Sequence, residues 1–419
     1  MICVKRIGAA VLMTIALAVP QTVFGAGFQE TTQSGTAVGM VNAGVANPDE
    51  PNSSYYNPAA MAFRDGLKVY AGSSLIIPTI DYKPFEGENG DAETDSEFGI
   101  FPLPNFHMEY ALSENLSAGM GFGLTAPYGL TVDWPNDWRG REVNEFVQIA
   151  TLSANPNLAY EIGDTGLSIA GGAQIVYSWV ELHRDVQLTE DQFVQTELGG
   201  DGWGFGGVAA VMYRPTDNLT FGAQYRSRFN VEYKDAEVHF EGEEDTPFYS
   251  TFRDNTGTAD ITFPDALHAG VGYQWNKLFL QFEVGYTIWD TFDVIDVEID
   301  TQGDEEAISG FELENRWENA FAFRLGGQYD VTPTIPVRLG VAYDRSPIPD
   351  ETVNATLPGN DRIAGSIGAG YKFMENWRVD AAYELVDVME REIRNDIGPR
   401  GIYNAIGHVF TANVGWGYE

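Results

Sequence analysis

Five histidines, one cysteine and several arginines are the residues whose types could do chemistry. The histidines are His107, His183, His239, His268 and His408. None of them stands in a GxSxG, HExxH or paired-histidine pattern, the arrangements that bring a base to a nucleophile or hold a metal. Cys3 is the only cysteine, and it lies in a segment that we expect to be removed. The sequence therefore predicts no catalytic residue, no metal site and no cofactor, and we expect that the protein is not an enzyme.

Arginine side chains are the better candidates for binding. The planar guanidinium can form two parallel hydrogen bonds to a carboxylate. Arg226 and Arg324 lie in stretches of alternating polarity. The bland alternative is that such charges form ion pairs that anchor neighbouring segments. The charged residues that we place on one polar face are Arg226, Arg228, Glu232, Glu283, Arg324, Arg338, Asp344, Lys372, Arg378, Asp380 and Glu384.

A second group of candidates combines charge with aromatic surface. Arg139 and Arg141 follow closely on Trp134 and Trp138 in a connecting segment. A cationic group beside flat apolar rings could receive an anionic molecule with an apolar body. An ordinary solvated loop is the alternative, and the sequence does not decide between the two.

The overall charge excludes one large class of partners. The chain has 419 residues, with 61 acidic against 24 basic residues and a formal net charge of −37. Nucleic-acid binding depends on clustered lysine and arginine, so we expect no nucleic-acid partner. With 44% hydrophobic residues the chain can bury a large core.

The N-terminal segment predicts export. Lys5 and Arg6 precede an apolar run over 7–19, and Val23-Phe24-Gly25 forms a small-residue cleavage site, which together are typical of a signal peptide over residues 1–25. After residue 26 the sequence has no run of about 18 to 20 apolar residues, the length a membrane-spanning helix requires. If the mature chain lies in a membrane, it must cross it as strands.

The remaining sequence alternates between apolar and polar residues over long stretches. Residues 219–233, 278–288 and 377–385 show this period of two, and such runs are long enough for strands that cross a bilayer at a tilt. Six short turns alternate with seven long, acidic connections, one of them over about 182–201, which predicts fourteen strands. A soluble β-sandwich also alternates, but the leader and the unequal connections favour a closed antiparallel barrel over residues 65–419.

Residues 26–64 do not share the alternation. They are rich in Gly, Ala, Ser and Asn, and they contain too little apolar surface to fold alone. We expect this segment to fill the lumen as a plug, the hatch. Asn57 precedes Pro58 and Ala59, and proline restricts the preceding residue to extended conformations, so the hatch should turn there at a stiff corner.

Several short motifs, taken in order, resemble the FadL family of outer-membrane channels for long-chain fatty acids and hydrocarbons. The resemblance covers essentially the whole mature chain, and its order and spacing are more specific than any one motif. The motifs are Ala26-Gly27-Phe28-Gln29, Asn57-Pro58-Ala59, 119–129 with its three alternating glycines, Trp203-Gly204-Phe205-Gly206, Phe263-Pro264-Asp265, Tyr286-Thr287-Ile288-Trp289 and 344–349.

The resemblance implies a channel in the outer membrane of a Gram-negative bacterium for passive, hatch-gated uptake of hydrophobic molecules. It implies that Gly27, Phe28 and Gln29, with Asn57, Pro58 and Ala59, take part in gating, and that Phe28 touches the substrate. It also implies a lateral exit at a kinked third strand, where Gly119, Gly121 and Gly123 lack side chains on one face. The alternative is that these glycines only make room for the hatch.

Other functions and partners follow as expectations. A general porin for small polar solutes, and a structural or adhesive barrel, are the alternative functions. We expect contacts with outer-membrane lipid and lipopolysaccharide, and we expect a monomer. The last strand ends on Glu419 in place of the aromatic residue usual for such barrels, with Tyr418 one position before it.

Overall fold

The computed structural model describes residues 27–86, 93–113, 117–189, 192–241, 254–300 and 310–418. The expected signal peptide over 1–25, Ala26 and Glu419 lie outside the described residues. No helix among the described residues is long and apolar enough to span a membrane.

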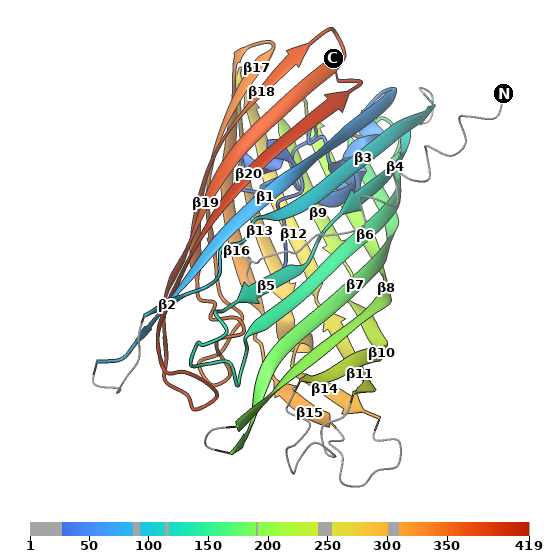
Figure 1. The fold of residues 1–419 in the computed structure, drawn as a ribbon. Helices are drawn as coiled ribbons and strands as arrows, with labels where there is room; N and C mark the ends of the chain where they lie inside the picture. Colours follow the sequence, from blue (N-terminus) through green and yellow to red (C-terminus); the bar gives the residue numbers. More distant parts are fainter. Residues whose placement is uncertain are drawn as a thin grey trace, which may run out of the picture.

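The alternating stretches form one antiparallel sheet that closes on itself (Figure 1). Closure is made by β1 and β20, whose ladder runs from Val69 opposite Trp416 to Pro84 opposite Gly401. The strands are β1 Leu67–Pro84, β2 Thr94–Asp95, β3 Phe101–Ser113, β4 Ala118–Thr125, β5 Gly129–Asp133, β6 Phe146–Glu161, β7 Leu167–Thr189, β8 Gln192–Thr216, β9 Leu219–Arg226, β10 Phe229–Glu241, β11 Asn255–Phe263, β12 Asp265–Trp275, β13 Leu278–Ile288, β14 Val294–Ile299, β15 Gly310–Glu314, β16 Ala320–Thr332, β17 Ile335–Asp344, β18 Arg362–Phe373, β19 Trp377–Ile393 and β20 Gly401–Trp416.

These segments make fourteen spanning strands, as the sequence predicted. The short β2 pairs with β1 inside a connection. Five spanning strands are each built from two segments, namely β4 with β5, β9 with β10, β11 with β12, β13 with β14, and β15 with β16. The all-β, closed barrel class is confirmed.

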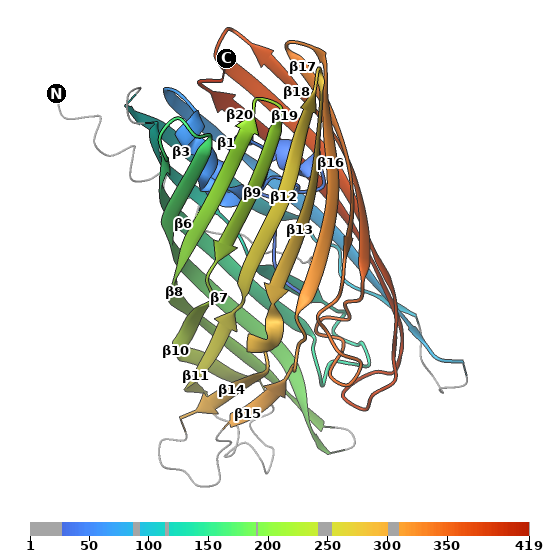
Figure 2. The same ribbon diagram turned by 180° about the vertical axis from the view of Figure 1, so that it is seen from behind.

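The two ends of the barrel differ, as Figures 1 and 2 show. Short turns join the strands at the end where the C-terminus lies, and this is called the short-turn end below. At the opposite end, the loop end, β7 and β8 continue as one long hairpin up to Thr189 and Gln192. The sequence predicted a loop over 182–201 there. The ladder instead continues, because β-branched and aromatic residues such as Val194 and Phe193 also pair well outside a membrane.

Alternation along most strands places apolar side chains outside and polar ones inside. In β13, Leu280 and Phe282 are exposed whereas Gln281 and Glu283 are buried. This matches the predicted faces.

One predicted face was wrong. The stretch 219–233 is not a single strand, because it breaks at Ser227 and Arg228 between β9 and β10. The break inverts the alternation, so Phe229, Val231 and Tyr233 are buried inside. Arg228 and Glu232 consequently point outward, not toward the lumen as predicted.

The segment before β1 lies inside the barrel, at the short-turn end (Figure 2). It contains two helical turns, α2 Gly35–Val38 and α3 Ser53–Tyr56, and the 3-10 helix η1 Pro58–Phe63. Ser34 caps α2 by accepting hydrogen bonds from the backbone N–H groups of Thr36 and Ala37. Nearly every residue from Gly27 to Ala62 is buried, so this segment occupies the lumen.

Candidate functional site

The wall around the hatch is built with glycines. A side chain on Gly119 would meet the carbonyl oxygen of Met61 at 2.8 Å, and side chains on Gly121 and Gly123 would collide with Met61 and Ser54. The same hatch backbone lies against glycines of β9, β12, β16, β17 and β18. The three glycines predicted at a lateral opening therefore sit in regular strand β4, where the hatch fills the space beside them.

Charged wall residues bind the hatch backbone. Glu283 accepts hydrogen bonds from the N–H groups of Gly44 and Val45, at 2.9 and 3.0 Å. Arg226 donates to the carbonyl oxygen of Tyr55 at 2.7 Å. Its guanidinium also lies over the Tyr55 ring, which adds a cation–π interaction. The structure therefore places Arg226 as a hatch anchor.

The predicted corner at Asn57 is part of these contacts. The Asn57 side chain accepts from the N–H of Ala59 at 3.0 Å and donates to the carbonyl of Val45 at 2.7 Å, while Pro58 opens η1. This geometry caps the 3-10 helix and ties together two parts of the hatch.

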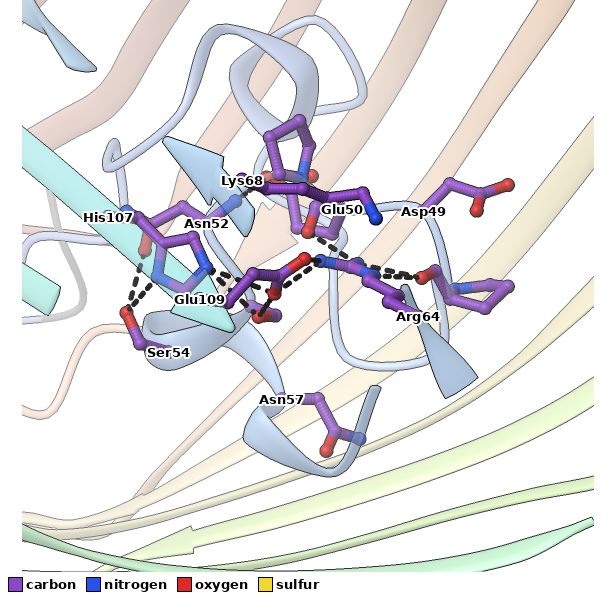
Figure 3. A network of polar contacts seen from close by, with 12 residues as sticks. Asp49, Glu50, Asn52, Ser54, Asn57, Arg64, Lys68, His107 and Glu109 are labelled. Atoms are coloured by element: carbon purple, nitrogen blue, oxygen red, sulfur yellow. Dashed lines mark hydrogen bonds and ion pairs between the residues drawn. The ribbon is translucent and has the colours of Figure 1, made fainter. Parts of the chain in front are cut away.

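A buried ionic network holds the end of the hatch to β3 (Figure 3). Arg64 donates to both carboxylate oxygens of Glu109, at 3.0 and 2.9 Å. His107 lies between Glu109, at 3.2 Å, and the hydroxyl of Ser54, at 2.8 Å. The order Ser54–His107–Glu109 is that of a hydrolytic triad, but all three side chains are buried in the contact between hatch and wall. We interpret it as an anchor.

The third spanning strand is interrupted between β4 and β5. β4 pairs with β3 as far as Leu124, whereas β5 pairs with β6 and has no ladder to β3 among the described residues. The N-terminal segment pairs with the interruption: the N–H of Gly129 donates to the carbonyl of Phe28 at 3.0 Å, and Glu30 donates to Pro127 at 2.7 Å. Gln29 forms a bridge with Tyr128.

Phe28 fills an aromatic box at this point. Its ring centroid lies 4.9 Å from that of Trp289, 5.1 Å from Phe292 and 5.5 Å from Trp317. Tyr128 and Phe263 complete the box. Gly27 has φ +74°, and a side chain there would collide with Trp289, so only glycine fits before Phe28.

Above Phe28, toward the loop end, lies a cavity of about 600 Å³. Its walls are mainly apolar, with contributions from eight spanning strands and from the connection before β18. The apolar residues that line it are Phe28, Leu130, Val147, Ile149, Val180, Leu182, Leu198, Tyr233, Ala259, Ile261, Phe292, Ile295, Val297, Leu313, Trp317, Ile348, Val353, Leu357 and Ile397. Most drug-sized ligands bind in cavities of about 300 to 1,000 Å³ with such a lining.

One cation lines this cavity, Arg184. Its guanidinium lies 4.0 Å from the ring centroid of Phe311, and it makes no hydrogen bond or ion pair within the described chain. Thr196, its cross-strand neighbour, is buried, and its hydroxyl also has no partner in the part of the chain described. Sequence reasoning missed both residues. The signal was the alternation Val180, Leu182, Arg184, which places the arginine on the apolar inner face.

The other predicted binding residues lie elsewhere. Arg324 pairs with Asp344 at 3.6 Å, and Arg141 pairs with Asp185 at 2.9 Å. Trp134 and Trp138 stack on each other with centroids 4.3 Å apart and are buried between connections. Arg139 lines a separate surface depression at the loop end.

The space on the other side of the hatch has a different character. A vestibule of about 910 Å³ opens at the short-turn end. Its lining is rich in charge, with Arg64, Lys68, Arg214, Lys372 and Asp330 among the residues. The hatch thus separates an apolar cavity from a polar vestibule.

An apolar exterior, a closed ladder and a lumen filled by the N-terminal segment define a plugged outer-membrane β-barrel. The chain belongs to the outer membrane transport protein family described as OMPP1/FadL/TodX, whose family model matches residues 16–414. The location in the outer membrane, predicted from the sequence, is therefore confirmed.

Relatives agree over nearly the whole length. The chain is 23% identical to the long-chain fatty acid transport protein of Salmonella typhi, over 88% of this chain and 89% of that protein. A FadL homologue of Pseudomonas aeruginosa has the same fold, with a TM-score of 0.82, 21% identity, and coverage of 94% of this chain and 100% of that one. The toluene transporter TbuX of Ralstonia pickettii is similar at a TM-score of 0.68 and 15% identity, covering 92% and 98%.

Proposed function

We propose that the protein takes up long-chain fatty acids passively across the outer membrane, with the cavity above Phe28 as the binding chamber. The observation that carries this proposal is Arg184, a half-buried cation in a mainly apolar cavity that makes no hydrogen bond or ion pair within the described chain. Partial removal of an unpaired charge from water is costly, so the cavity suits a ligand that supplies an anion together with a long apolar body. The relative in Salmonella typhi is named for transport of this substrate class.

The route that we propose leaves through the wall. The hatch is fastened by Glu283, Arg226 and the Arg64–Glu109 pair, and the vestibule beyond it is charged. An apolar molecule gains nothing by entering that vestibule. Withdrawal of Phe28 and its neighbours Gly27 and Gln29 would instead open the interruption between β3 and β5 toward the membrane. Gly119, Gly121 and Gly123 would then serve chiefly to seat the hatch.

A neutral hydrocarbon is the second candidate substrate. The observation that favours it is the aromatic box around Phe28, which suits a ring as well as an alkyl chain. A porin would need an open polar lumen, which the buried hatch opposes. We further propose that the barrel acts as a monomer in contact with lipid and lipopolysaccharide, without enzymatic activity.

The experiment is displacement of a fluorescent fatty acid from the detergent-purified protein. Unlabelled long-chain fatty acid and toluene are titrated in parallel. Displacement by the fatty acid at a much lower concentration than toluene supports the proposal. Displacement by toluene at a comparable concentration would make hydrocarbons the proposed substrate. Failure to bind the probe would contradict both candidate substrates.

A further inference from the structure

The wall has a second place without a hydrogen-bonded ladder, between β8 and the strand formed by β9 and β10. The ladder with β9 ends at Val208 opposite Arg226, and the ladder with β10 begins only at Gly199 opposite Glu237. Both strands are fully described over this stretch. Between these limits Ser227 donates to the carbonyl of Gly207 at 2.9 Å. We call the stretch from Gly200 to Gly207, with the facing part of β10, the seam.

Packing on bare backbone closes the seam. The inner face of β8 carries Gly200, Gly202, Gly204 and Gly206, so β10 can lie directly against it. A β-carbon on Gly202 would meet the carbonyl oxygen of Glu232 at 2.6 Å, and one on Gly204 would meet the Phe229 ring at 2.5 Å. β10 thus overlaps β8 from the inside. Van der Waals contacts are individually weak and non-directional, unlike the hydrogen bonds of a β-ladder.

The seam lies between the cavity and the lipid. On the outside, Trp203 and Phe205 are 58% and 69% exposed. On the inside, Leu198 of β8 and Tyr233 of β10 line the cavity. Leu198 follows Thr196, the neighbour of Arg184, along the inner face of β8. A molecule whose head is held at Arg184 would therefore extend its tail along β8 toward the seam.

The seam is also connected to Phe28. Phe229, which covers Gly204, stacks on Phe263 with centroids 4.8 Å apart. Phe263 and Tyr128 both contact the Phe28 ring, and Tyr128 lies in the interruption of the third strand. One aromatic cluster therefore supports both breaks in the wall, so withdrawal of Phe28 removes packing from each of them.

We propose that the seam is a second lateral opening, through which the alkyl chain of the cargo passes between the cavity and the outer-membrane lipid. The inference rests on the proposed function. An alkyl chain fits because the surfaces that would part are glycine backbone and the side chains of Phe229 and Val231. The hydroxyl of Tyr233 is already bonded to Ser178 at 2.8 Å and offers no free polar group.

A disulfide across the seam tests the proposal. A β-carbon on Gly200 would lie 2.9 Å from that of Ala236 and 3.3 Å from that of Tyr233, close to the roughly 3.5 to 4.5 Å of a disulfide. Cys3 is the only native cysteine and precedes the mature chain as we expect it. The variant is therefore Gly200→Cys with Ala236→Cys. If this pair does not assemble, Gly202→Cys with Val231→Cys replaces it, because a β-carbon on Gly202 would lie 2.7 Å from Cγ1 of Val231 and Val231 does not line the cavity.

Uptake of labelled long-chain fatty acid is measured in Gram-negative cells without a fatty-acid channel of their own. Oxidation of the double variant should lower uptake by about half or more, reductant should restore it, and probe binding should not change. The single variants should not respond to oxidant. Unchanged uptake in the oxidised variant would overturn the seam as a passage. Absence of uptake by the unmodified protein would instead overturn the proposed function.

Discussion

Arg184 is the residue on which substrate choice depends. Its guanidinium has an aromatic neighbour, Phe311, but no carboxylate partner within the described chain. A ligand carboxylate would supply the missing partner by accepting a charge-assisted hydrogen bond from Arg184. The hydroxyl of Thr196, which has no partner within the described chain, could donate a second hydrogen bond to the same carboxylate. Neutral hydrocarbons would not gain from either group.

Replacement of Arg184 tests this directly. For Arg184→Gln we expect fatty-acid affinity to fall by about 10- to 100-fold, since hydrogen bonds to charged groups contribute about 1.5 to 3 kcal/mol. Toluene binding should stay the same. Arg141→Gln is the matched control, because Arg141 pairs with Asp185 and does not line the cavity. Equal losses in both variants, measured by probe displacement, would remove the special role of Arg184.

Glu50 in the hatch predicts a pH dependence. Burial raises the pKa of Glu50, although Ser34 and Asn52 donate hydrogen bonds to it. When the pKa of a carboxyl group is raised in the folded state, the folded protein loses stability as the pH rises above the ordinary pKa of about 4.3. The reason is that the carboxyl group ionises at a lower pH in the unfolded chain than in the folded one. Glu50→Gln should therefore stabilise the barrel more at pH 8 than at pH 5. Thermal unfolding at both pH values measures the difference, and a constant difference would contradict it.

Residue types were easier to predict than residue roles. The sequence indicated that arginines would meet polar partners, but the partner of each depends on how hatch and wall meet. Arg226 is engaged by hatch carbonyl groups, and Arg324 by Asp344. Arg184 makes no ion pair within the described chain, because Leu182 beside it on the inner face is apolar and its cross-strand neighbour Thr196 carries no charge. Only the register of β7 and β8 reveals this.

At the scale of elements, the hatch and the glycine wall form one fitted unit. Gly123→Ala would place a methyl group onto Ser54, so we expect a less stable hatch, with overpacking costing about 1 to 3 kcal/mol. Gly365→Ala is the control, because Gly365 of β18 has open space around it. Thermal unfolding and protease cleavage within residues 27–64 would report the effect. Equal stability of the two variants would show that Gly123 does not seat the hatch.

Strand number and orientation could be predicted because the period of two survives in most strands. Breaks within strands could not. The motif Phe263-Pro264-Asp265 contained the signal for one break, since proline cannot donate to a ladder. At Ser227 no comparable residue marks the break, and the inverted alternation of Phe229, Val231 and Tyr233 looks like uninterrupted strand. The reason for the four glycines in β8 could not be predicted, because it depends on the packing of β10 directly against them.

The whole molecule combines a filled lumen with a wall whose hydrogen-bonded ladder is interrupted at several junctions. The hatch divides apolar cavity from charged vestibule, which opposes free passage of polar solutes. The interruption between β3 and β5 and the seam between β8 and β10 are two junctions without a complete ladder among the described residues. A further gap lies between the pair Ala259–Val297 and the pair Asp265–Ile288. Hydrophobic cargo in the cavity therefore contacts the interrupted junctions of the wall directly, whereas the charged vestibule lies beyond the hatch.

The most direct test of this account is uptake by intact Gram-negative cells without their own fatty-acid channel. Labelled long-chain fatty acid and a labelled small sugar are supplied in parallel to cells with and without this protein. The account predicts saturable uptake of the fatty acid, lost with Arg184→Gln, and no increase in sugar uptake. Sugar uptake without fatty-acid uptake would show a porin and would contradict the account.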